Sequence, residues 1–90
     1  MNLQEIRKSV DDVDNEIVRL YKKRMSLCDE IGEYKKKNNM PIYDPVREKE
    51  KLKILCSLAD DNSDRQEIEE LFSHIMLMSR KRQAFIFGED

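Results

Sequence analysis

The most informative residues of this 90-residue chain are polar side chains that stand where apolar ones are expected. Arg24 occupies a position on the apolar stripe that runs through Leu20. A guanidinium on such a stripe is costly unless it finds an anion or hydrogen-bond partners. Lys35 shares a helical face with Arg24, about three turns further along. Two cations on one side of a helix indicate a site for an anionic ligand.

A second apolar stripe, near the C-terminal end of the sequence, is interrupted in the same way. Its apolar positions Ile68, Phe72 and Ile75 continue to Ser79 and Gln83, which are one helical turn apart. Both are neutral hydrogen-bonding side chains on a face that is expected to be buried. Taken alone, they could simply bond to each other or to the backbone. Together with the two cations they indicate a polar pocket.

A third group of polar residues surrounds Pro45. Asp44 before Pro45 is typical of a helix cap followed by the first helical residue. Glu48 lies in the first turn, where a carboxylate complements the helix dipole, and Arg47 precedes it. Helix N-termini also offer free N–H groups that favour anions. Taken alone, each of these residues is explained by its position at the start of a helix. They predict a site only if they lie close to the cations and the neutral polar residues described above.

Converging in a helical bundle, these groups would form a pocket for a small ligand. Their chemistry suits a compound with two carboxylates, a hydroxyl and a neutral oxygen. No pair of Cys, His or carboxylate residues has convincing metal spacing, so we expect no metal and no cofactor. Three further cations flank the site positions, and we interpret them as solvated surface: Arg80, Lys81 and Arg82.

Three helices would position these residues, at about 3–37, 45–60 and 64–87. In the first, Asn2 and Glu5 match a capping box, and apolar residues recur at alternating steps of three and four. At ~1.5 Å per residue this helix would be ~50 Å long. Pro41 should push the residue before it out of the helical region, which predicts a loop.

The third helix has two possible caps, Ser63 with Gln66 or Asp64 with Glu67. The two shorter helices would cover the long one only partly. A second copy, with the two long helices packed on each other, completes the burial most simply. The sequence therefore predicts an all-α fold, with residues 1–90 as a single domain in an intertwined helical homodimer.

Composition excludes several classes of protein. Charged residues make up 40% of the chain, with only 2 Gly and 2 Pro, which favours long solvated helices. A net charge of −2 argues against a dedicated nucleic-acid binder. No apolar run approaches the roughly 20 residues needed to cross a membrane, and no signal peptide is visible. Cys28 and Cys56 fall inside predicted helices and suggest no disulfide framework, so we expect a reducing, cytoplasmic location.

The residues singled out above form a pattern that resembles the helical class of chorismate mutases, from about residue 3 to residue 86. The strongest local motif runs from Tyr43 to Glu50, and the full pattern is Arg7, Arg24, Lys35, Asp44-Pro45-Val46-Arg47-Glu48, Ser79 and Gln83. The resemblance implies the Claisen rearrangement of chorismate to prephenate in the biosynthesis of phenylalanine and tyrosine. This isomerisation needs no acid, base or covalent intermediate, which fits a pocket built for orientation and preorganised electrostatics.

The resemblance also implies roles for the charged residues. Arg24 would clamp one substrate carboxylate, and Arg7, donated by the partner chain, would clamp the other. Arginine suits this task because its planar fork matches a carboxylate. Lys35 and Gln83 would donate hydrogen bonds to the ether oxygen, where negative charge grows.

The remaining roles concern the substrate's hydroxyl and the frame of the pocket. Glu48 would accept a hydrogen bond from the ring hydroxyl, together with the Asp44 backbone. Ser79 would contact a carboxylate, Arg47 would orient carboxylates, and Ile31 would form an apolar wall.

Two other interpretations stay open at this level. An isochorismate-pyruvate lyase on the same scaffold would also use a cationic pocket. A non-catalytic helical dimerisation or regulatory module would explain the long helix, but it leaves Arg24, Lys35 and Gln83 without a shared purpose. A complex with another shikimate-pathway enzyme is compatible with all of these interpretations.

Overall fold

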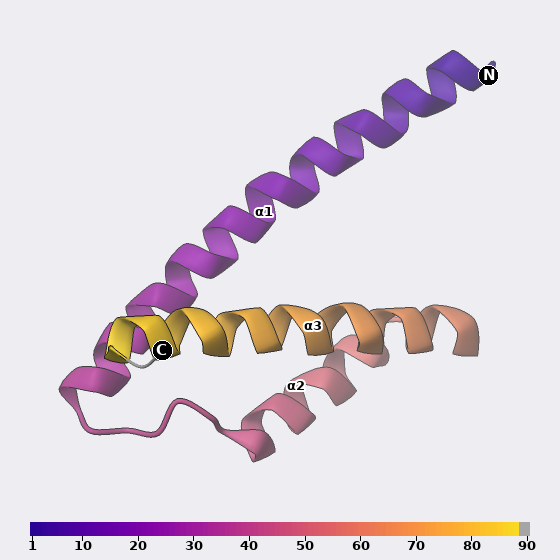
Figure 1. Ribbon diagram of the computed structural model, residues 1–90. Helices are drawn as coiled ribbons and strands as arrows, with labels where there is room; N and C mark the ends of the chain where they lie inside the picture. Colours follow the sequence, from indigo (N-terminus) through magenta and orange to yellow (C-terminus); the bar gives the residue numbers. More distant parts are fainter. Residues whose placement is uncertain (89–90) are drawn as a thin grey trace.

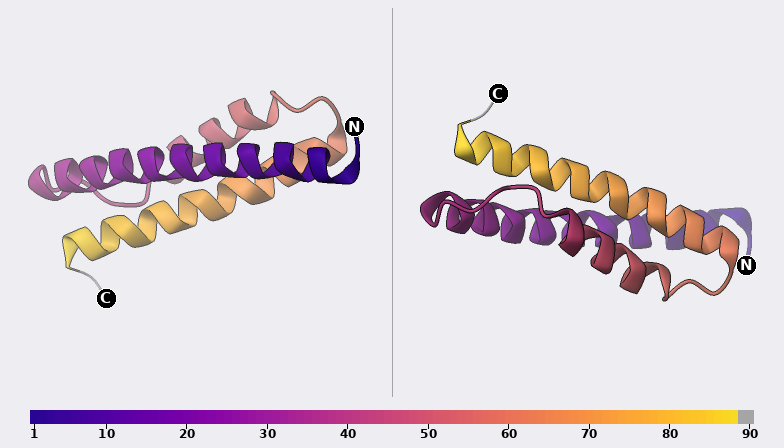
Figure 2. Two further views of the ribbon diagram at one scale, coloured as in Figure 1. Left: turned by 90° about the horizontal axis from the view of Figure 1, so that it is seen from above. Right: turned by 90° about the horizontal axis from the view of Figure 1, so that it is seen from below.

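The computed structural model describes residues 1–88, which form three helices and no strand: α1 (Leu3–Lys37), α2 (Pro45–Cys56) and α3 (Asn62–Phe87). The expected all-α class with three helices is therefore correct. α3 packs against both other helices, whereas α1 and α2 do not pack on each other within residues 1–88 (Figure 1). Seen from below, α2 and the N-terminal half of α3 form a helical hairpin (Figure 2). No helix in residues 1–88 is long and apolar enough to span a membrane.

The start of α1 is held by a capping box. The Asn2 side chain accepts a hydrogen bond from the Glu5 backbone N–H at 2.9 Å, and the Glu5 carboxylate accepts one from the Asn2 N–H at 3.3 Å. Two N–H groups that lack helical partners are satisfied in this way. The helix therefore begins where the sequence signal places it.

The end of α1 is set by Asn39, which the sequence interpretation overlooked in favour of Pro41. Asn39 has a φ of 54°, in the left-handed region. The N–H of Met40 donates to the Lys35 carbonyl at 2.8 Å, and the N–H of Asn39 donates to the Lys36 carbonyl at 3.4 Å. This pattern is a Schellman motif, with asparagine in the place that glycine usually occupies. It turns the loop of residues 38–44 back toward the start of α2.

The second helix is shorter than predicted and ends at Cys56 instead of near residue 60. The Ser57 hydroxyl donates to the Ile54 carbonyl at 2.5 Å. This side-chain bond competes for a carbonyl that a continuing helix would pair with a backbone N–H. The next two residues, Leu58 and Ala59, bond three residues back, which tightens the chain into a turn.

The third helix begins earlier than predicted, and both predicted caps are wrong. The N-cap is Asp61, whose carboxylate accepts a hydrogen bond from the Asp64 N–H at 2.8 Å. Ser63 and Asp64 lie inside the first turn of α3. Several capping residues stand in a row in this segment, so the pattern alone could not select among them.

The core of residues 1–88 is small. Met25 and Cys28 from α1 and Met76 from α3 are buried where these two helices cross, whereas Cys56 is buried at the end of α2, beside Arg65 of α3. Gly32 lets α3 approach α1 closely, because a Cβ there would lie 3.1 Å from Gln83 Cγ.

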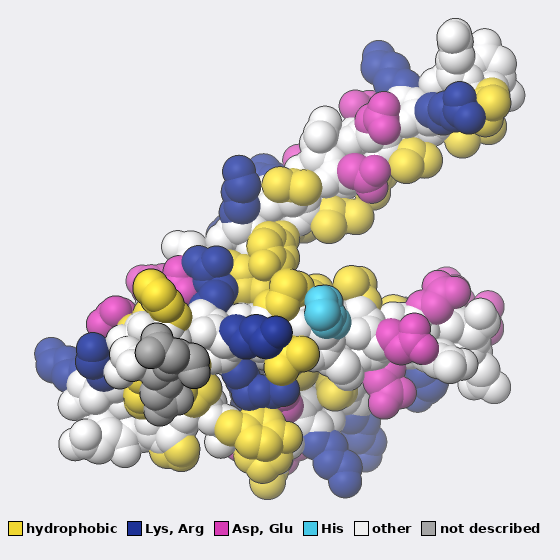
Figure 3. All heavy atoms as spheres, in the orientation of Figure 1, with side chains coloured by type: hydrophobic (Ala, Val, Ile, Leu, Met, Phe, Trp, Pro, Cys, Tyr) yellow, Lys and Arg dark blue, Asp and Glu magenta, His cyan; other side chains and the backbone are white. Residues whose placement is uncertain are grey.

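The N-terminal part of α1, residues 3–20, diverges from the other two helices, and we call it the arm. Apolar side chains line the side of this arm that faces α3 across the open angle (Figure 3). Val13 and Ile17 are each 58% exposed. The radius of gyration is 16.3 Å, against about 12 Å for a compact chain of this length. This apolar stripe has no partner among residues 1–88.

Candidate active site

A cavity of about 350 Å³ lies between the C-terminal half of α1, the N-terminus of α2 and α3. All of the predicted site residues except Arg7 line it. They come from separate parts of the sequence: Arg24, Ile31, Lys35, Asp44, Arg47, Glu48, Ser79 and Gln83.

Arg24 is oriented by α3. Its Nη1 donates to Ser79 Oγ at 2.6 Å and lies 3.5 Å from Cys28 Sγ. The Ser79 hydroxyl in turn donates to the Ile75 carbonyl at 2.9 Å. A guanidinium carries five N–H donors, so most of them remain free for an anion. The hydroxyl of Ser79 is thus engaged with the protein and holds the arginine in place.

Lys35 connects α1 to the loop before α2. Its Nζ donates to the Ile42 carbonyl oxygen at 2.8 Å. An ammonium has three donors, so two remain available to a ligand in the cavity. The side chain is half-buried, which reduces the competition from water.

The start of α2 contributes the acidic side of the cavity. Asp44 caps the helix, with its Oδ1 accepting a hydrogen bond from the Arg47 N–H at 3.0 Å. This bond occupies one oxygen of the carboxylate and fixes the first turn, from which Glu48 projects. Arg47 itself is exposed at the rim.

Gln83 and Ser79 are the most buried polar residues of the site, each 6% exposed. The Oε1 of Gln83 is buried and has no hydrogen-bond partner within residues 1–88. An unpaired buried polar atom costs about 1–3 kcal/mol, so native proteins seldom retain one without a purpose. The amide therefore identifies the cavity as a place where a polar ligand group belongs.

Arg80 also belongs to the site, contrary to its interpretation as solvated surface. Its guanidinium forms an ion pair with the Glu48 carboxylate and lies 4.7 Å from the centre of the Tyr43 ring. The sequence offers only a weak signal for this, because Arg80 follows the apolar residue Met76 by one helical turn. Lys51, one turn after Arg47, is a second lining residue that the sequence interpretation missed.

Arg7 lies outside the cavity. It is exposed on the arm of α1, away from the three-helix crossing. Within one chain the site therefore contains Arg24 but lacks the second predicted carboxylate clamp.

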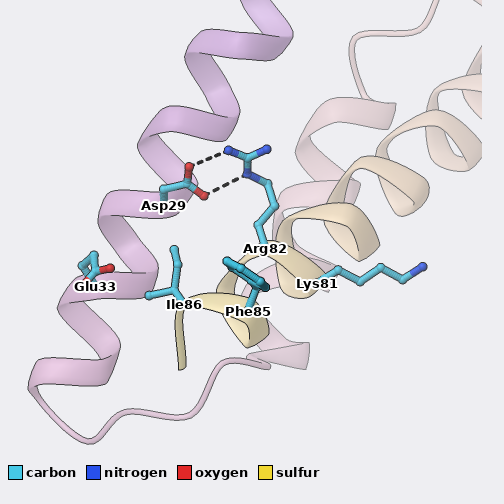
Figure 4. Close-up of a pocket in the computed structure, with 6 residues that line it drawn as sticks. All are labelled: Asp29, Glu33, Lys81, Arg82, Phe85 and Ile86. Atoms are coloured by element: carbon cyan, nitrogen blue, oxygen red, sulfur yellow. Dashed lines mark hydrogen bonds and ion pairs between the residues drawn. The ribbon is translucent and has the colours of Figure 1, made fainter. Parts of the chain in front are cut away.

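A larger cavity, of about 630 Å³, lies on the other side of the α1–α3 contact (Figure 4). Here Arg82 binds the Asp29 carboxylate through two hydrogen bonds, of 2.9 and 2.6 Å. Hydrogen bonding by Arg82 lowers the pKa of Asp29, because it stabilises the charged carboxylate. The same hydrogen bonding raises the pKa of Arg82, because it stabilises the charged guanidinium. Because Asp29 already neutralises Arg82, the larger cavity offers an anionic ligand less free positive charge than the cavity at Gln83.

The free N–H donors of Arg24 and Lys35 in the smaller cavity suit a small anionic ligand. Within residues 1–88, no group of three or more His, Cys, Asp or Glu side chains is arranged to hold a metal ion. The family model for chorismate mutase type II matches residues 6–84.

The chain belongs to the chorismate mutase type II family.

Individual relatives show the same similarity over part of their length. A bifunctional chorismate mutase/prephenate dehydratase of Aquifex aeolicus is 50% identical over 48 residues, which cover 53% of this chain and 13% of the relative. A chorismate mutase of Methanocaldococcus jannaschii is 42% identical over 57 residues, covering 60% of this chain and 58% of the relative. A 3-dehydroquinate dehydratase of Pyrobaculum aerophilum is 41% identical over 51 residues, covering 57% and 17%. The matched part of the chain thus corresponds to between about an eighth and three fifths of the length of these three relatives.

Proposed function

We propose that this chain is a chorismate mutase, which rearranges chorismate to prephenate in the biosynthesis of phenylalanine and tyrosine. The observation that carries the proposal is the buried, unpaired amide of Gln83 in one cavity with Arg24 and Lys35. Membership of the type II family supports the same reaction.

The rearrangement is pericyclic, so the protein would act by orientation and electrostatics. Arg24 would bind one carboxylate of chorismate through the N–H groups that Ser79 leaves free. Ser79 would contact the same carboxylate by turning its hydroxyl hydrogen from the Ile75 carbonyl to the carboxylate, while continuing to accept the bond from Arg24. The partner's Arg7 would bind the second carboxylate. Two fixed clamps would favour the folded, reactive conformer over the extended one.

The ether oxygen gains negative charge as its bond to carbon breaks. Lys35 would donate to it with one of the two N–H groups that Ile42 does not use. The Gln83 amide would donate from the opposite side, since a half-turn of the amide presents its NH₂ group. Donors aimed at this oxygen stabilise the transition state more than the substrate, which is the condition for acceleration.

The other polar group of the substrate is its ring hydroxyl. Glu48 would accept a hydrogen bond from it, together with the backbone of Asp44. Arg47 at the rim would orient the carboxylates on entry, and Ile31 would form the apolar wall against the ring. No step in this scheme uses a cofactor.

The proposed active form is a homodimer in which two α1 helices pack together. The exposed apolar stripe of the arm supports it, because burying that stripe requires a second chain. An antiparallel pairing would bring Arg7 of one chain toward Arg24 and Lys35 of the other. A parallel pairing would instead place the two Arg7 residues side by side.

The proposed location is the cytoplasm, where a reducing environment would keep Cys28 and Cys56 as free thiols. The relatives named above include proteins much longer than this chain, one of them a bifunctional chorismate mutase/prephenate dehydratase. A complex with another shikimate-pathway enzyme is consistent with that similarity.

The decisive test is the loss of chorismate absorbance on adding purified protein, with acid conversion of prephenate to phenylpyruvate as the product check. Saturable conversion that EDTA does not inhibit is the expected result. Salicylate and pyruvate from isochorismate, without prephenate from chorismate, would identify a lyase instead. A folded dimer inactive toward both compounds would contradict the enzymatic proposal and favour a regulatory module.

A further inference from the structure

Arg80 connects three segments that meet at the mouth of the cavity. It projects from α3, pairs with Glu48 in the first turns of α2, and lies over the ring of Tyr43 in the preceding loop. Both partners of the ion pair are partly shielded, with side chains 28% and 23% exposed. No other cation within residues 1–88 forms an ion pair with Glu48.

These contacts restrict the motion of Glu48. A glutamate has three rotatable side-chain bonds and, near a helix start, samples several rotamers in water. An ion pair to a guanidinium that is itself stacked on an aromatic ring selects one of them. The ring stacking matters because a freely moving arginine would leave the carboxylate almost as mobile as before.

The loop of residues 38–44 is held from both of its sides. Lys35 of α1 binds the Ile42 carbonyl, and Arg80 of α3 covers the adjacent Tyr43. The loop leads directly into Asp44, whose carboxylate sets the first turn of α2. The position of Glu48 therefore depends on α3 through Arg80 as well as on its own helix.

We propose that Arg80 is a positioning residue, which holds the Glu48 carboxylate in the orientation that accepts the hydroxyl of the bound substrate. The inference rests on the proposed function, because it deepens the role of Glu48 in that site. Arg80 acts through Glu48 and Tyr43 and does not itself bind the substrate.

A hydroxyl that keeps its hydrogen bond throughout the rearrangement contributes equally to substrate and transition-state binding. Loss of such uniform binding raises KM and leaves kcat nearly unchanged. We therefore expect Arg80→Ala to raise KM for chorismate about tenfold, with kcat within about threefold of wild type. Arg80→Lys, which keeps the charge without the planar fork, should fall between the two proteins.

The matched control is Lys81→Ala, which removes the same charge from the neighbouring residue of α3. Lys81 is exposed and lines the other cavity, so its loss should leave KM at the wild-type value (Figure 4). Circular dichroism and the midpoint of denaturant unfolding, measured for all variants, separate a folding defect from a local effect.

A double-mutant cycle with Glu48→Gln distinguishes positioning from direct contact. If Arg80 acts through the Glu48 carboxylate, adding Arg80→Ala to Glu48→Gln should change KM by less than about twofold. If Arg80→Ala raises KM by the same factor with or without Glu48→Gln, the inference is wrong. It is also wrong if the KM of Arg80→Ala equals that of the Lys81→Ala control. Both results leave the proposed function intact, because wild-type protein still converts chorismate. A wild-type protein without that activity would contradict the proposed function and this inference together. If Arg80→Ala does not fold, Arg80→Lys in the same cycle gives the same decision.

Discussion

At the scale of single residues, the amide of Gln83 is both buried and proposed to take part in the reaction. It lies on the face of α3 that packs against Gly32, and its Oε1 has no hydrogen-bond partner in the part of the chain that the structure describes. We expect Gln83→Ala to lower kcat for chorismate about 100-fold or more, because it would remove the proposed donor to the ether oxygen. Steady-state kinetics with size-exclusion chromatography would check both turnover and assembly.

The matched control for that variant is Gln66→Ala, an exposed glutamine in the first turns of the same helix. It should have wild-type turnover. If Gln83→Ala also kept wild-type kcat in an intact dimer, the amide would have no role in the reaction.

The residue scale also shows what the sequence could and could not predict. Arg24 and Gln83 broke strong apolar stripes, and a polar residue on such a stripe must be compensated, so both were identifiable. Arg80 stands beside two other cations, a context typical of solvated surface. Its role depends on Glu48 and Tyr43, which only the tertiary packing brings near it.

At the scale of helices, the crossing of α1 and α3 depends on Gly32. A Cβ at this position would lie 3.1 Å from both Gln83 Cγ and Ile86 Cδ1. Gly32→Ala gains about 0.5–1 kcal/mol of helix propensity, while crowding in a packed interior costs about 1–3 kcal/mol. We therefore expect the free energy of unfolding to fall by no more than about 2.5 kcal/mol, while kcat falls about tenfold because Gln83 shifts.

Denaturant unfolding and steady-state kinetics on the same Gly32→Ala preparation would separate the two effects. A protein with wild-type kcat would show that the crossing tolerates the methyl group and that the position of Gln83 does not depend on it.

The same two helices are joined by the pair of Asp29 and Arg82, which makes the stability depend on pH. Hydrogen bonding by Arg82 lowers the pKa of Asp29 in the folded state. The pair therefore stabilises the protein above the ordinary aspartate pKa, and this contribution disappears as the pH falls below about 4. Asp29→Asn should lower the unfolding midpoint at pH 7 and have a smaller effect at pH 3.

Glu33→Gln provides the comparison for this pH dependence. It removes a carboxylate one turn along α1, in the same groove but not bonded to Arg82 (Figure 4). Equal midpoint changes for the two variants at both pH values would mean that Asp29 contributes only general charge.

Helix boundaries were predictable where one signal acted alone. Asn2 and Glu5 form the only capping arrangement at the start of α1, and the helix begins there. At the start of α3 several acidic and hydroxyl residues compete, and the sequence pattern does not show that Asp61 supplies the cap. The early end of α2 depends on the Ser57 hydroxyl, a local bond with no strong sequence signature.

At the scale of the whole molecule, the arm of α1 is the dominant feature. The chain measures 54 × 26 × 19 Å, and the arm carries a continuous apolar stripe without a partner. In the proposed antiparallel dimer each site combines Arg24 of one chain with Arg7 of the other. The dimer itself stays a prediction, since it depends on a contact between two chains.

Mixing two inactive variants tests that arrangement. In an equal mixture of Arg7→Ala and Arg24→Ala, random exchange makes about half of the dimers hybrids, and each hybrid has one site with both arginines. We therefore expect recovery of about a quarter of wild-type activity. Absence of recovery, with exchange confirmed by native mass spectrometry, would mean that each site draws on one chain only.

The small core of this chain has a consequence for its evolution. Met25, Cys28 and Met76 share the helix crossing with Ser79 and Gln83, so the residues that hold the fold together surround the residues that would bind the ligand. An apolar substitution of Gln83 would remove its unpaired buried oxygen and thereby favour the folded state, at the expense of the pocket. Stability and turnover therefore place opposite demands on the side chain at this position of α3.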